Sequence, residues 1–471
     1  MGLLEETTVL SRVANADAAA LQNQIAGQVI LPEDERYEEA RLAHNRSIDQ
    51  RPALIVSALT AADIAAAVRF AREQGLAIAV QSTGHGVPVA ADGALLILTG
   101  RLQSLKIDPE LQTARIGAGL RWGEVLAETQ RFKLAPLLGS SPLVGVVGYS
   151  LGGGLGWLAR KHGIAADSVL RIELVTMTGE IIRASAEEHA DLFWALRGGG
   201  GSFGIVTAIE VRLFPVSTVY GGNLVYPGEM AREVMRRYRD WIAALPEEMT
   251  TSVMLINFPP IPQVPDVFRG KSFVMVRGCY AGPVEAGAAL VQSWRDWQAP
   301  LIDDFGEMAF AQVAKISNDP INPAPSKTTG AWMRELSDAA IDTLVQYARP
   351  RATPPGLTAV EVRHVGGAMN RAPADLNAFS HRDADLLLFA VGSTPTPELV
   401  SAMRVYTDAM LRDLQPALTG GVFLNFTGLQ EARDRTRAGF AAGVFERLQA
   451  VKAKYDPENC LRFGFDIAPG E

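Results

Sequence analysis

Cysteine and long apolar runs are both scarce in this sequence, and each scarcity excludes a class of protein. Only two of the 471 residues are cysteine, Cys279 and Cys460, which argues against a disulfide framework and against a cysteine-based metal site. No apolar run reaches the roughly 18 residues that a membrane-spanning helix needs. Lys and Arg number 44 against 52 Asp and Glu, giving a net charge of −8, which favours neither a nucleic acid nor an anionic membrane as partner.

The N-terminus carries no recognisable targeting signal. Its first six residues, Met-Gly-Leu-Leu-Glu-Glu, lack the basic segment and apolar core of a signal peptide. They also lack the Ser or Thr of a myristoylation signal. Apolar residues make up 48% of the chain, enough for two or three domains. We therefore expect a soluble, cytoplasmic protein without a metal, a membrane partner or a nucleic-acid partner.

Glycine, in contrast, is abundant, and the glycines concentrate between residues 138 and 216. A glycine-dense backbone loses much conformational entropy on folding. Such a stretch indicates that a bulky ligand lies directly against the main chain. The three segments that carry it are Gly-Ser-Ser-Pro-Leu-Val-Gly-Val-Val-Gly at 139–148, Leu-Gly-Gly-Gly-Leu-Gly-Trp at 151–157 and Gly-Gly-Gly-Gly-Ser-Phe-Gly at 198–204.

Residues 199–204 also match the Gly-x-Gly-x-x-Gly dinucleotide fingerprint letter for letter. That fingerprint binds a dinucleotide where it follows a strand and opens a helix. Here a helix predicted at 191–197 precedes it and a strand predicted at 205–214 follows it. The context argues against an NAD-type Rossmann site.

The first half of the chain reads as short strands with a few helices. Thr60 and Asp63 resemble a capping box, which opens a helix that Gly75 ends. This helix joins two predicted strands in a βαβ unit. The predicted strands are 28–30, 53–56, 77–80, 94–98, 113–119, 170–177, 180–184 and 205–214, and the other predicted helices are 14–25, 122–130 and 191–197.

The second strand of the βαβ unit runs straight into Gln-Ser-Thr-Gly-His-Gly at 81–86. A loop of small residues after a buried strand presents backbone N–H groups to an anion. An ordinary tight turn is the alternative explanation for this loop taken alone.

After about residue 220 the glycine loops end and long strands alternate with amphipathic helices. The pattern predicts a sheet covered by helices, with a loop-rich excursion over 302–332, and then a strand at 421–426 and a helix at 431–454 before an irregular tail. The predicted domains are 1–217 (core about 48–216), 218–420 and 421–471. The predicted strands of the second domain are 251–257, 273–280, 358–364 and 385–391, and its helices are 230–245, 285–297, 338–348 and 398–414.

Together these motifs resemble the vanillyl-alcohol-oxidase superfamily. The order of Gly-His at 84–85, the glycine segments, Asp-Leu-Phe-Trp-Ala-Leu-Arg at 191–197 and Tyr-Asp-Pro-Glu-Asn at 455–459 is similar to the berberine-bridge-enzyme-like branch. The layout is close to that of bacterial members that attach their flavin once, such as the hydroxynicotine oxidases. The resemblance runs from about residue 27 to 469, is strongest over 53–212 and is weak over 220–415.

The resemblance implies an α+β fold. A PCMH-type FAD-binding domain of two subdomains would be followed by a substrate-binding domain, an antiparallel sheet covered by helices. A C-terminal berberine-bridge-type segment would then return to the FAD domain. The residues it implies for FAD binding are Gln81, Ser82, Thr83, Gly84, His85, Gly86, Ser141, Pro142, Gly145, Gly148, Tyr149, Gly152, Gly153, Gly156, Ile205, Val206 and Asn425.

His85 falls where the family attaches the flavin through its 8α-methyl group. A neutral imidazole nitrogen is nucleophilic at physiological pH, which suits that role. The alternative is a loop histidine that only donates and accepts hydrogen bonds. Many relatives attach FAD a second time through a cysteine just before Pro142, but this chain has Ser141 there. The expected cofactor is FAD, linked through His85 only.

Four positions are candidates for the catalytic site: Tyr149, Val144, Phe423 and Asn425. The family's oxidases tend to carry valine at the position of Val144, which favours reaction with O₂. Relatives that use a tyrosine base carry it at the positions of Leu155 or Phe423, and neither of these residues can take a proton. Tyr149 could substitute as the base, or it could be a packed aromatic side chain.

Other ionisable residues are further candidates. His364 and His381 could also act as base, although a histidine at the end of a strand is more often a surface residue. A cation near the flavin N1 and C2 carbonyl would stabilise reduced flavin; candidates are Arg160, Lys161 and Arg462. The family's tail carries asparagines where this chain has Gly464 and Asp466.

These features predict an FAD-dependent oxidase. Hydride would pass from a small organic substrate, an amine or an alcohol, to flavin N5, and O₂ would reoxidise the flavin to give H₂O₂. The missing tyrosine bases favour an amine, whose lone pair assists hydride loss. The alternatives are a flavin dehydrogenase with another electron acceptor and a non-catalytic flavin-binding protein.

Overall fold

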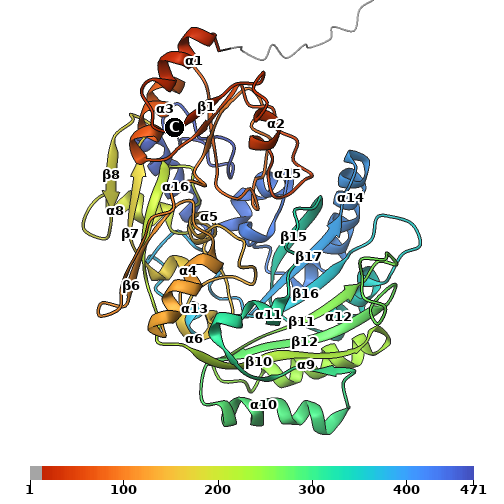
Figure 1. The fold of residues 1–471 in the computed structure, drawn as a ribbon. Coiled ribbons are helices and arrows are strands. Elements are labelled where there is room, and N and C mark those ends of the chain that lie inside the picture. The colour runs from red at the N-terminus through yellow and green to blue at the C-terminus, as the bar shows by residue number, and fades with distance from the viewer. Residues whose placement is uncertain (1–12, 471) are drawn as a thin grey trace, which may run out of the picture.

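The computed structural model describes residues 13–470, which form three β-sheets with helices packed against them (Figure 1). The interpretation of the first six residues lies outside the described range. In Figure 1 the two smaller sheets lie in the upper part of the molecule and the large sheet lies below them. The fold is α+β, as the resemblance implies.

The first sheet has four strands in the order β1-β2-β4-β3. β2 and β3 both run parallel to β4, so the βαβ unit forms with β4 inserted between its two strands. The capping box is confirmed: the Thr60 hydroxyl accepts a hydrogen bond from the Asp63 N–H, and the Asp63 carboxylate accepts one from the Thr60 N–H. The elements are α1 (Asn15–Gln22), β1 (Gln28–Ile30), α2 (Tyr37–Ala40), β2 (Leu54–Ser57), α3 (Ala61–Glu73), β3 (Ile78–Gln81) and β4 (Leu95–Leu98).

The second sheet has five antiparallel strands in the order β5-β6-β9-β7-β8. The glycine run at 198–204 connects the end of α8 to the start of β9, so the context predicted for this fingerprint is confirmed. The elements are β5 (Leu105–Asp108), β6 (Thr113–Gly117), α4 (Trp122–Thr129), η1 (Gln130–Phe132), α5 (Val146–Leu151), α6 (Ala159–His162), α7 (Ala165–Ser168), β7 (Val169–Val175), β8 (Ile181–Ala184), α8 (Ala190–Leu196) and β9 (Ile205–Arg212).

The third sheet is antiparallel, with the order β13-β10-β12-β11-β16-β17-β15, and β14 also pairs with β10. Helices α9, α10, α12 and α14 bury their apolar sides against one face of it. The elements are β10 (Thr218–Pro227), η2 (Gly228–Met230), α9 (Ala231–Ile242), β11 (Met249–Asn257), β12 (Ser272–Tyr280), α10 (Val284–Trp297), β13 (Ile302–Asp303), β14 (Gly306–Ala309), η3 (Phe310–Gln312), α11 (Ala314–Ser317), β15 (Ser326–Met333), α12 (Asp338–Ala348), β16 (Ala359–His364), α13 (Ala368–Arg371), β17 (Leu386–Ser393), α14 (Pro397–Asp413) and η4 (Gln415–Ala417).

The loop-rich interpretation of 302–332 is wrong in part. This segment contains β13, β14, α11 and most of β15, which pairs with β17 along its whole length. The partner strand lies far along the chain, so nothing in the local sequence pattern reveals the pairing. The proline-containing stretch between α11 and β15 is the part that is irregular.

The C-terminal segment differs from its prediction in two places. Residues 421–426 form no strand but end in η5 (Leu424–Phe426), and the helix expected over 431–454 is divided into α15 (Gln430–Asp434), η6 (Thr436–Gly439) and α16 (Val444–Tyr455). The break falls at glycines: Gly443 has φ +80°, and a Cβ on Gly439 would lie 2.7 Å from Leu424. Figure 1 shows this blue segment returning to the upper part of the molecule, with the C-terminus near α1 and α3.

The sheets change between β9, which ends at Arg212, and β10, which begins at Thr218. The domain limits at 217 and 420 remain predictions. Of the helices in residues 13–470, none is long and apolar enough to cross a membrane.

Candidate active site

A cavity of about 390 Å³ lies where the two smaller sheets, α5 and the C-terminal segment meet. Its volume is in the range of small-molecule and cofactor sites. Five stretches of chain supply most of its wall: 78–89, 139–155, 200–206, 424–427 and 461–465. The stretches are far apart in sequence, so only the complete fold assembles the cavity.

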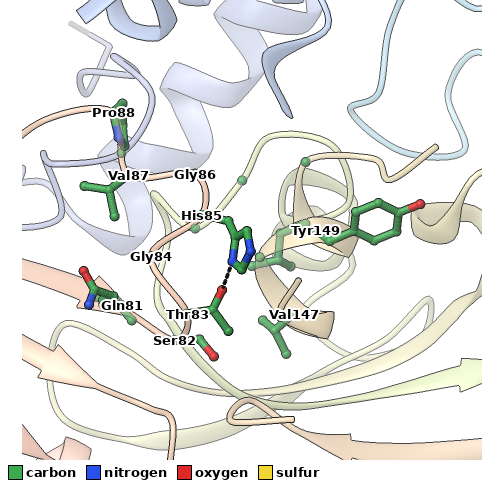
Figure 2. A pocket seen from close by; sticks show the side chains of 18 of the residues that line it. Gln81, Ser82, Thr83, Gly84, His85, Gly86, Val87, Pro88, Val147 and Tyr149 are labelled. Carbon is green, nitrogen blue, oxygen red and sulfur yellow. Dashed lines mark hydrogen bonds between the residues drawn. The ribbon is translucent and has the colours of Figure 1, made fainter. Parts of the chain in front are cut away.

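The loop after β3 places His85 in the cavity wall (Figure 2). Gly84 has φ +73°, and a Cβ there would lie 2.7 Å from the Ala43 Cα, so only glycine lets the loop pass so close to that backbone. The Nδ1 atom of His85 hydrogen-bonds the Thr83 hydroxyl at 2.8 Å. The ring of His44 stacks on the His85 ring with centroids 3.7 Å apart. These contacts fix the orientation of the imidazole.

Burial keeps the His85 ring neutral. Loss of solvation, with smaller contributions from His44 and Arg121, lowers the pKa of His85 to about 3. A neutral imidazole retains a nitrogen lone pair at physiological pH. The site therefore holds His85 in the protonation state that nucleophilic chemistry needs.

Neighbouring polar side chains hold the same loop to the first sheet. The Gln81 side chain accepts a hydrogen bond from Gln50 Nε2 at 2.9 Å and donates one to the Leu42 carbonyl at 2.9 Å. The Ser82 hydroxyl donates to the Ala118 carbonyl at 2.9 Å. The loop is therefore a fixed part of the wall.

The cavity wall suits FAD in two respects. At Gly86 and Gly148 a Cβ would meet no atom within 4 Å, so the bare backbone borders open space where a flat ring system can approach it. The hydroxyl of Ser202 lines the cavity, is buried and has no hydrogen-bond partner within the described residues. Buried polar atoms are rarely unpaired in native proteins, so Ser202 is a candidate donor to the cofactor.

Most of the residues predicted from the motifs share this one cavity. Besides the catalytic candidate Val144, those that line it are Gln81, Ser82, Thr83, Gly84, His85, Gly86, Ser141, Gly145, Gly148, Tyr149, Gly152, Ile205, Val206 and Asn425.

Four predicted residues do not line the cavity. A Cβ on Gly156 would lie 1.8 Å from the Leu138 carbonyl, and one on Gly153 would lie 2.5 Å from the Phe379 ring, so these two glycines serve close packing. Phe423 is buried in an aromatic cluster with Phe379. The Pro142 carbonyl accepts a hydrogen bond from the backbone of α4 at 2.8 Å. Pro142, Gly153, Gly156 and Phe423 therefore support the wall from behind.

Asn425 ties the C-terminal segment to α5. Its Nδ2 donates to the Tyr149 carbonyl at 3.0 Å. A Cβ on Gly152 would lie 1.8 Å from Asn425 Oδ1, so the residue that follows α5 must be glycine for Asn425 to reach it. This contact joins two motifs that the sequence places more than 270 residues apart.

The environment of Tyr149 opposes its role as a base. Figure 2 shows its hydroxyl directed away from His85. The hydroxyl is buried without a hydrogen-bond partner in the described part of the chain, and the ring packs edge-on against Trp122 with centroids 5.7 Å apart. Burial raises the pKa of Tyr149 far above 10. The alternative explanation, a packed aromatic, fits this environment.

The other ionisable candidates lie outside the cavity wall. The expectation that His364 lies at the surface is wrong, because the residue is buried. It bonds Arg160 at 2.8 Å, and burial lowers the pKa of His364 to about 3. His381 hydrogen-bonds the Ala438 carbonyl, and Lys161 donates to the Ala281 carbonyl. Arg462 does not line the cavity, although its neighbours do.

The two tail positions where the family carries asparagine differ in their surroundings. Gly464 lines the cavity, whereas the Asp466 carboxylate pairs with Arg433.

Three notable groups of wall residues are absent from the set predicted for FAD binding, although the glycine run was predicted to lie against a bulky ligand. The glycine run supplies Gly200, Gly201, Ser202 and Gly204, and the tail supplies Leu461 and Phe463–Phe465. The third is Arg363 of β16. The first two carried a signal, since the glycine run and the tail both belong to recognised motifs. The signal for Arg363 is the pair of charges in Val-Glu-Val-Arg, within a strand whose other residues before His364 are apolar.

Two family models match the chain. The model described as "FAD binding domain" matches residues 52–185, and the model described as "Berberine and berberine like" matches residues 422–465. Both matched regions contribute to the cavity wall.

Relatives and solved structures agree with these matches. The chain is 30% identical to (R)-6-hydroxynicotine oxidase from Paenarthrobacter nicotinovorans, over 94% of this chain and 97% of the relative. It is 27% identical to chitooligosaccharide oxidase from Gibberella zeae, over 95% and 94%. The fold superimposes on 6-hydroxy-D-nicotine oxidase from Arthrobacter nicotinovorans with a TM-score of 0.80 at 25% identity, over 95% and 98%. It superimposes on wild-type Physcomitrella patens BBE-like 1 with a TM-score of 0.83 at 23% identity, over 96% and 99%.

The motifs, the cavity and these similarities agree on one family. The chain belongs to the berberine-bridge-enzyme-like branch of the vanillyl-alcohol-oxidase superfamily and is an FAD-dependent oxidoreductase of the oxidase type.

Proposed function

We propose that the enzyme carries FAD attached through His85 alone and oxidises a small organic amine or alcohol, with O₂ as the electron acceptor. When bound, FAD supplies a hydride acceptor at N5 and passes the electrons on to O₂, giving H₂O₂. The observation that carries the proposal is the His85 imidazole, which is neutral, oriented and exposed to the cavity.

The single linkage follows from the residue at the second attachment position. A solved glucooligosaccharide oxidase from Acremonium strictum has, by its title, a 6-S-cysteinyl, 8α-N1-histidyl FAD. In this chain Ser141 lines the cavity, and its hydroxyl accepts a hydrogen bond from the Leu143 N–H at 3.3 Å. A serine hydroxyl is a far weaker nucleophile than a thiolate, which supports a single bond, through the histidine.

The lining residues favour an amine over an alcohol. Within the described wall, the ionisable side chains are His85, Tyr149 and Arg363, and no carboxylate is among them. An alcohol must lose its hydroxyl proton to a base as hydride leaves, whereas a neutral amine assists with its own lone pair. The relatives include both classes, a hydroxynicotine oxidase and a chitooligosaccharide oxidase.

Two features support O₂ as acceptor. Val144, the residue typical of the family's oxidases at this position, lies in the cavity wall. Several relatives over the full length are named oxidases. A flavin dehydrogenase with another acceptor is the competing function, and release of H₂O₂ under air separates the two.

The linkage is tested by precipitating the purified protein with acid. Wild type should leave yellow flavin in the pellet, and His85→Ala should release it to the supernatant while still binding FAD through the rest of the cavity. Ser141→Ala is the matched control and should behave as wild type. A yellow supernatant from wild type would contradict the covalent bond, and a colourless protein that FAD cannot reconstitute would contradict FAD binding itself.

A further inference from the structure

One cationic side chain from the large sheet reaches the cavity. Arg363 of β16 is the only residue between 218 and 420 among the described residues that line it. Along β16 the side chains of Val360 and Val362 face the helix-covered core, so Glu361 and Arg363 face the opposite side, toward the cavity. The substrate-binding domain therefore meets the cavity through a guanidinium group.

Arg363 belongs to a cluster of three charged side chains. Glu361 pairs with Arg277 of β12 through one carboxylate oxygen and with Arg363 Nε at 3.0 Å through the other. The side chains of Arg277 and Glu361 are each 2% exposed, and that of Arg363 is 14% exposed. Burial alone would raise the pKa of Glu361, but the two guanidinium groups lower it to about 2. Two cations against one ionised carboxylate leave one unbalanced positive charge.

The unbalanced charge is presented at Arg363. All three guanidinium nitrogens of Arg277 are engaged, with Glu361, the Ser252 hydroxyl and the Ser317 carbonyl. Arg363 uses only Nε, and within the described residues its two terminal nitrogens have no hydrogen-bond partner. A guanidinium with two free terminal nitrogens matches the two oxygens of a carboxylate.

The surroundings hold this group in place. The Arg363 guanidinium lies 4.7 Å from the ring centroid of Phe426, and the Phe426 ring packs against Phe389 with centroids 4.9 Å apart. Phe426 follows Asn425 in η5, and both line the cavity. The described wall offers no carboxylate that could neutralise Arg363 from the cavity side.

We propose that Arg363 is an anion subsite and that the substrate is an acid, a small amine or alcohol that also carries a carboxylate. The inference rests on the proposed function. Arg363 would bind the carboxylate of the substrate, and the carbon of the same molecule that bears the amine or hydroxyl group would be oxidised. A competing role for Arg363 is to stabilise negative charge on the reduced flavin. The two roles predict different ligand affinities. An anion subsite binds a carboxylate more tightly than its neutral amide, whereas stabilisation of the reduced flavin gives no such preference.

The experiment uses the flavin-containing enzyme with benzoate and benzamide as a matched pair of probes, followed through the visible spectrum of the flavin. Wild type should bind benzoate more tightly than benzamide. Arg363→Gln should weaken benzoate about 10- to 100-fold, the amount that one charge-assisted contact contributes, and leave benzamide nearly unchanged. Arg363→Lys, which keeps the charge without the fork, should restore part of the benzoate affinity.

A control variant, two outcomes and the acid-precipitation test decide between the explanations. Arg131→Gln removes an exposed positive charge away from the cavity and should change neither affinity. Equal binding of benzoate and benzamide by wild type would overturn the subsite. The subsite would also be overturned if Arg363→Gln lowered the reduction potential of the flavin but kept the preference for benzoate. That result would assign Arg363 to stabilising the reduced flavin. The acid-precipitation test is run first, so a colourless protein counts against the proposed function, and a yellow protein without preference counts against the subsite alone.

Discussion

Replacing Glu361 by glutamine should destabilise the protein by about 3 to 5 kcal/mol, because it leaves Arg277 buried without a countercharge. The lowered pKa of Glu361 agrees with this loss in direction and rough size. A fall from 4.5 to about 2 on folding corresponds to about 3 kcal/mol in favour of the folded state. Both figures come from the same geometry, a carboxylate shared between Arg277 and Arg363 at 2% exposure.

Urea denaturation followed by tryptophan fluorescence measures this loss, since Trp294 is buried in the core of the large sheet and its helices. With a slope of about 3 kcal/mol per molar urea, the midpoint should fall by roughly 1 M or more. Asp342→Asn is the matched control. It removes a carboxylate from an exposed pair with Arg232 and should shift the midpoint very little.

The effect of Glu361 should also depend on pH in one direction. Its pKa is lower in the folded state, so the carboxylate stabilises the fold above the unfolded value of about 4.5 and ceases to do so as the pH falls toward 2. The difference in unfolding free energy between wild type and Glu361→Gln should therefore reach its full value at roughly pH 6 and become smaller at roughly pH 3. A midpoint shift as small as that of the control, or a gap that does not change with pH, would refute the reasoning.

Two further predictions concern the cavity wall. Tyr149→Phe should leave kcat within about twofold of wild type, because the hydroxyl is buried without a partner among the described residues and its raised pKa opposes proton transfer; a loss of about 100-fold or more would make Tyr149 the base. Lys452→Met removes a fully buried ammonium that donates to the Ser202 and Leu461 carbonyls and pairs with Asp456. It should lower the thermal midpoint and weaken retention of FAD in the His85→Ala background, and an unchanged midpoint would contradict this role.

Most of the residues that the motifs predicted line one cavity. Gly84 and His85 are neighbours in one short loop, so a local motif predicts them together. Asn425 and its contact Gly152 lie far apart in the sequence, and both were predicted from the resemblance to the family. The capping box at Thr60 and Asp63 correctly predicted the start of α3. The apolar periodicity correctly predicted both ends of α12.

The features that the sequence did not predict depend mainly on interactions between distant parts of the chain. β15 contains Gly330 and follows prolines, and it is a strand because β17 pairs with it. Arg363 is a charged residue in an apolar strand, and only the fold shows that it borders the cavity and shares Glu361 with Arg277. The break between α15 and α16 was visible in the sequence at Gly439 and Gly443, but helical periodicity on both sides concealed it.

The tail that completes the cavity is synthesised after every other part of its wall. Leu461 and Phe465 line the cavity, and the Cys460 carbonyl accepts a hydrogen bond from the Ile78 N–H of β3 at 2.9 Å. The first sheet, whose strand β3 leads into the His85 loop, can fold while the ribosome is still adding the large sheet. The wall, however, stays open on one side until the tail has left the ribosome, so enclosure of the flavin is a late event that a chain truncated before the tail would never complete.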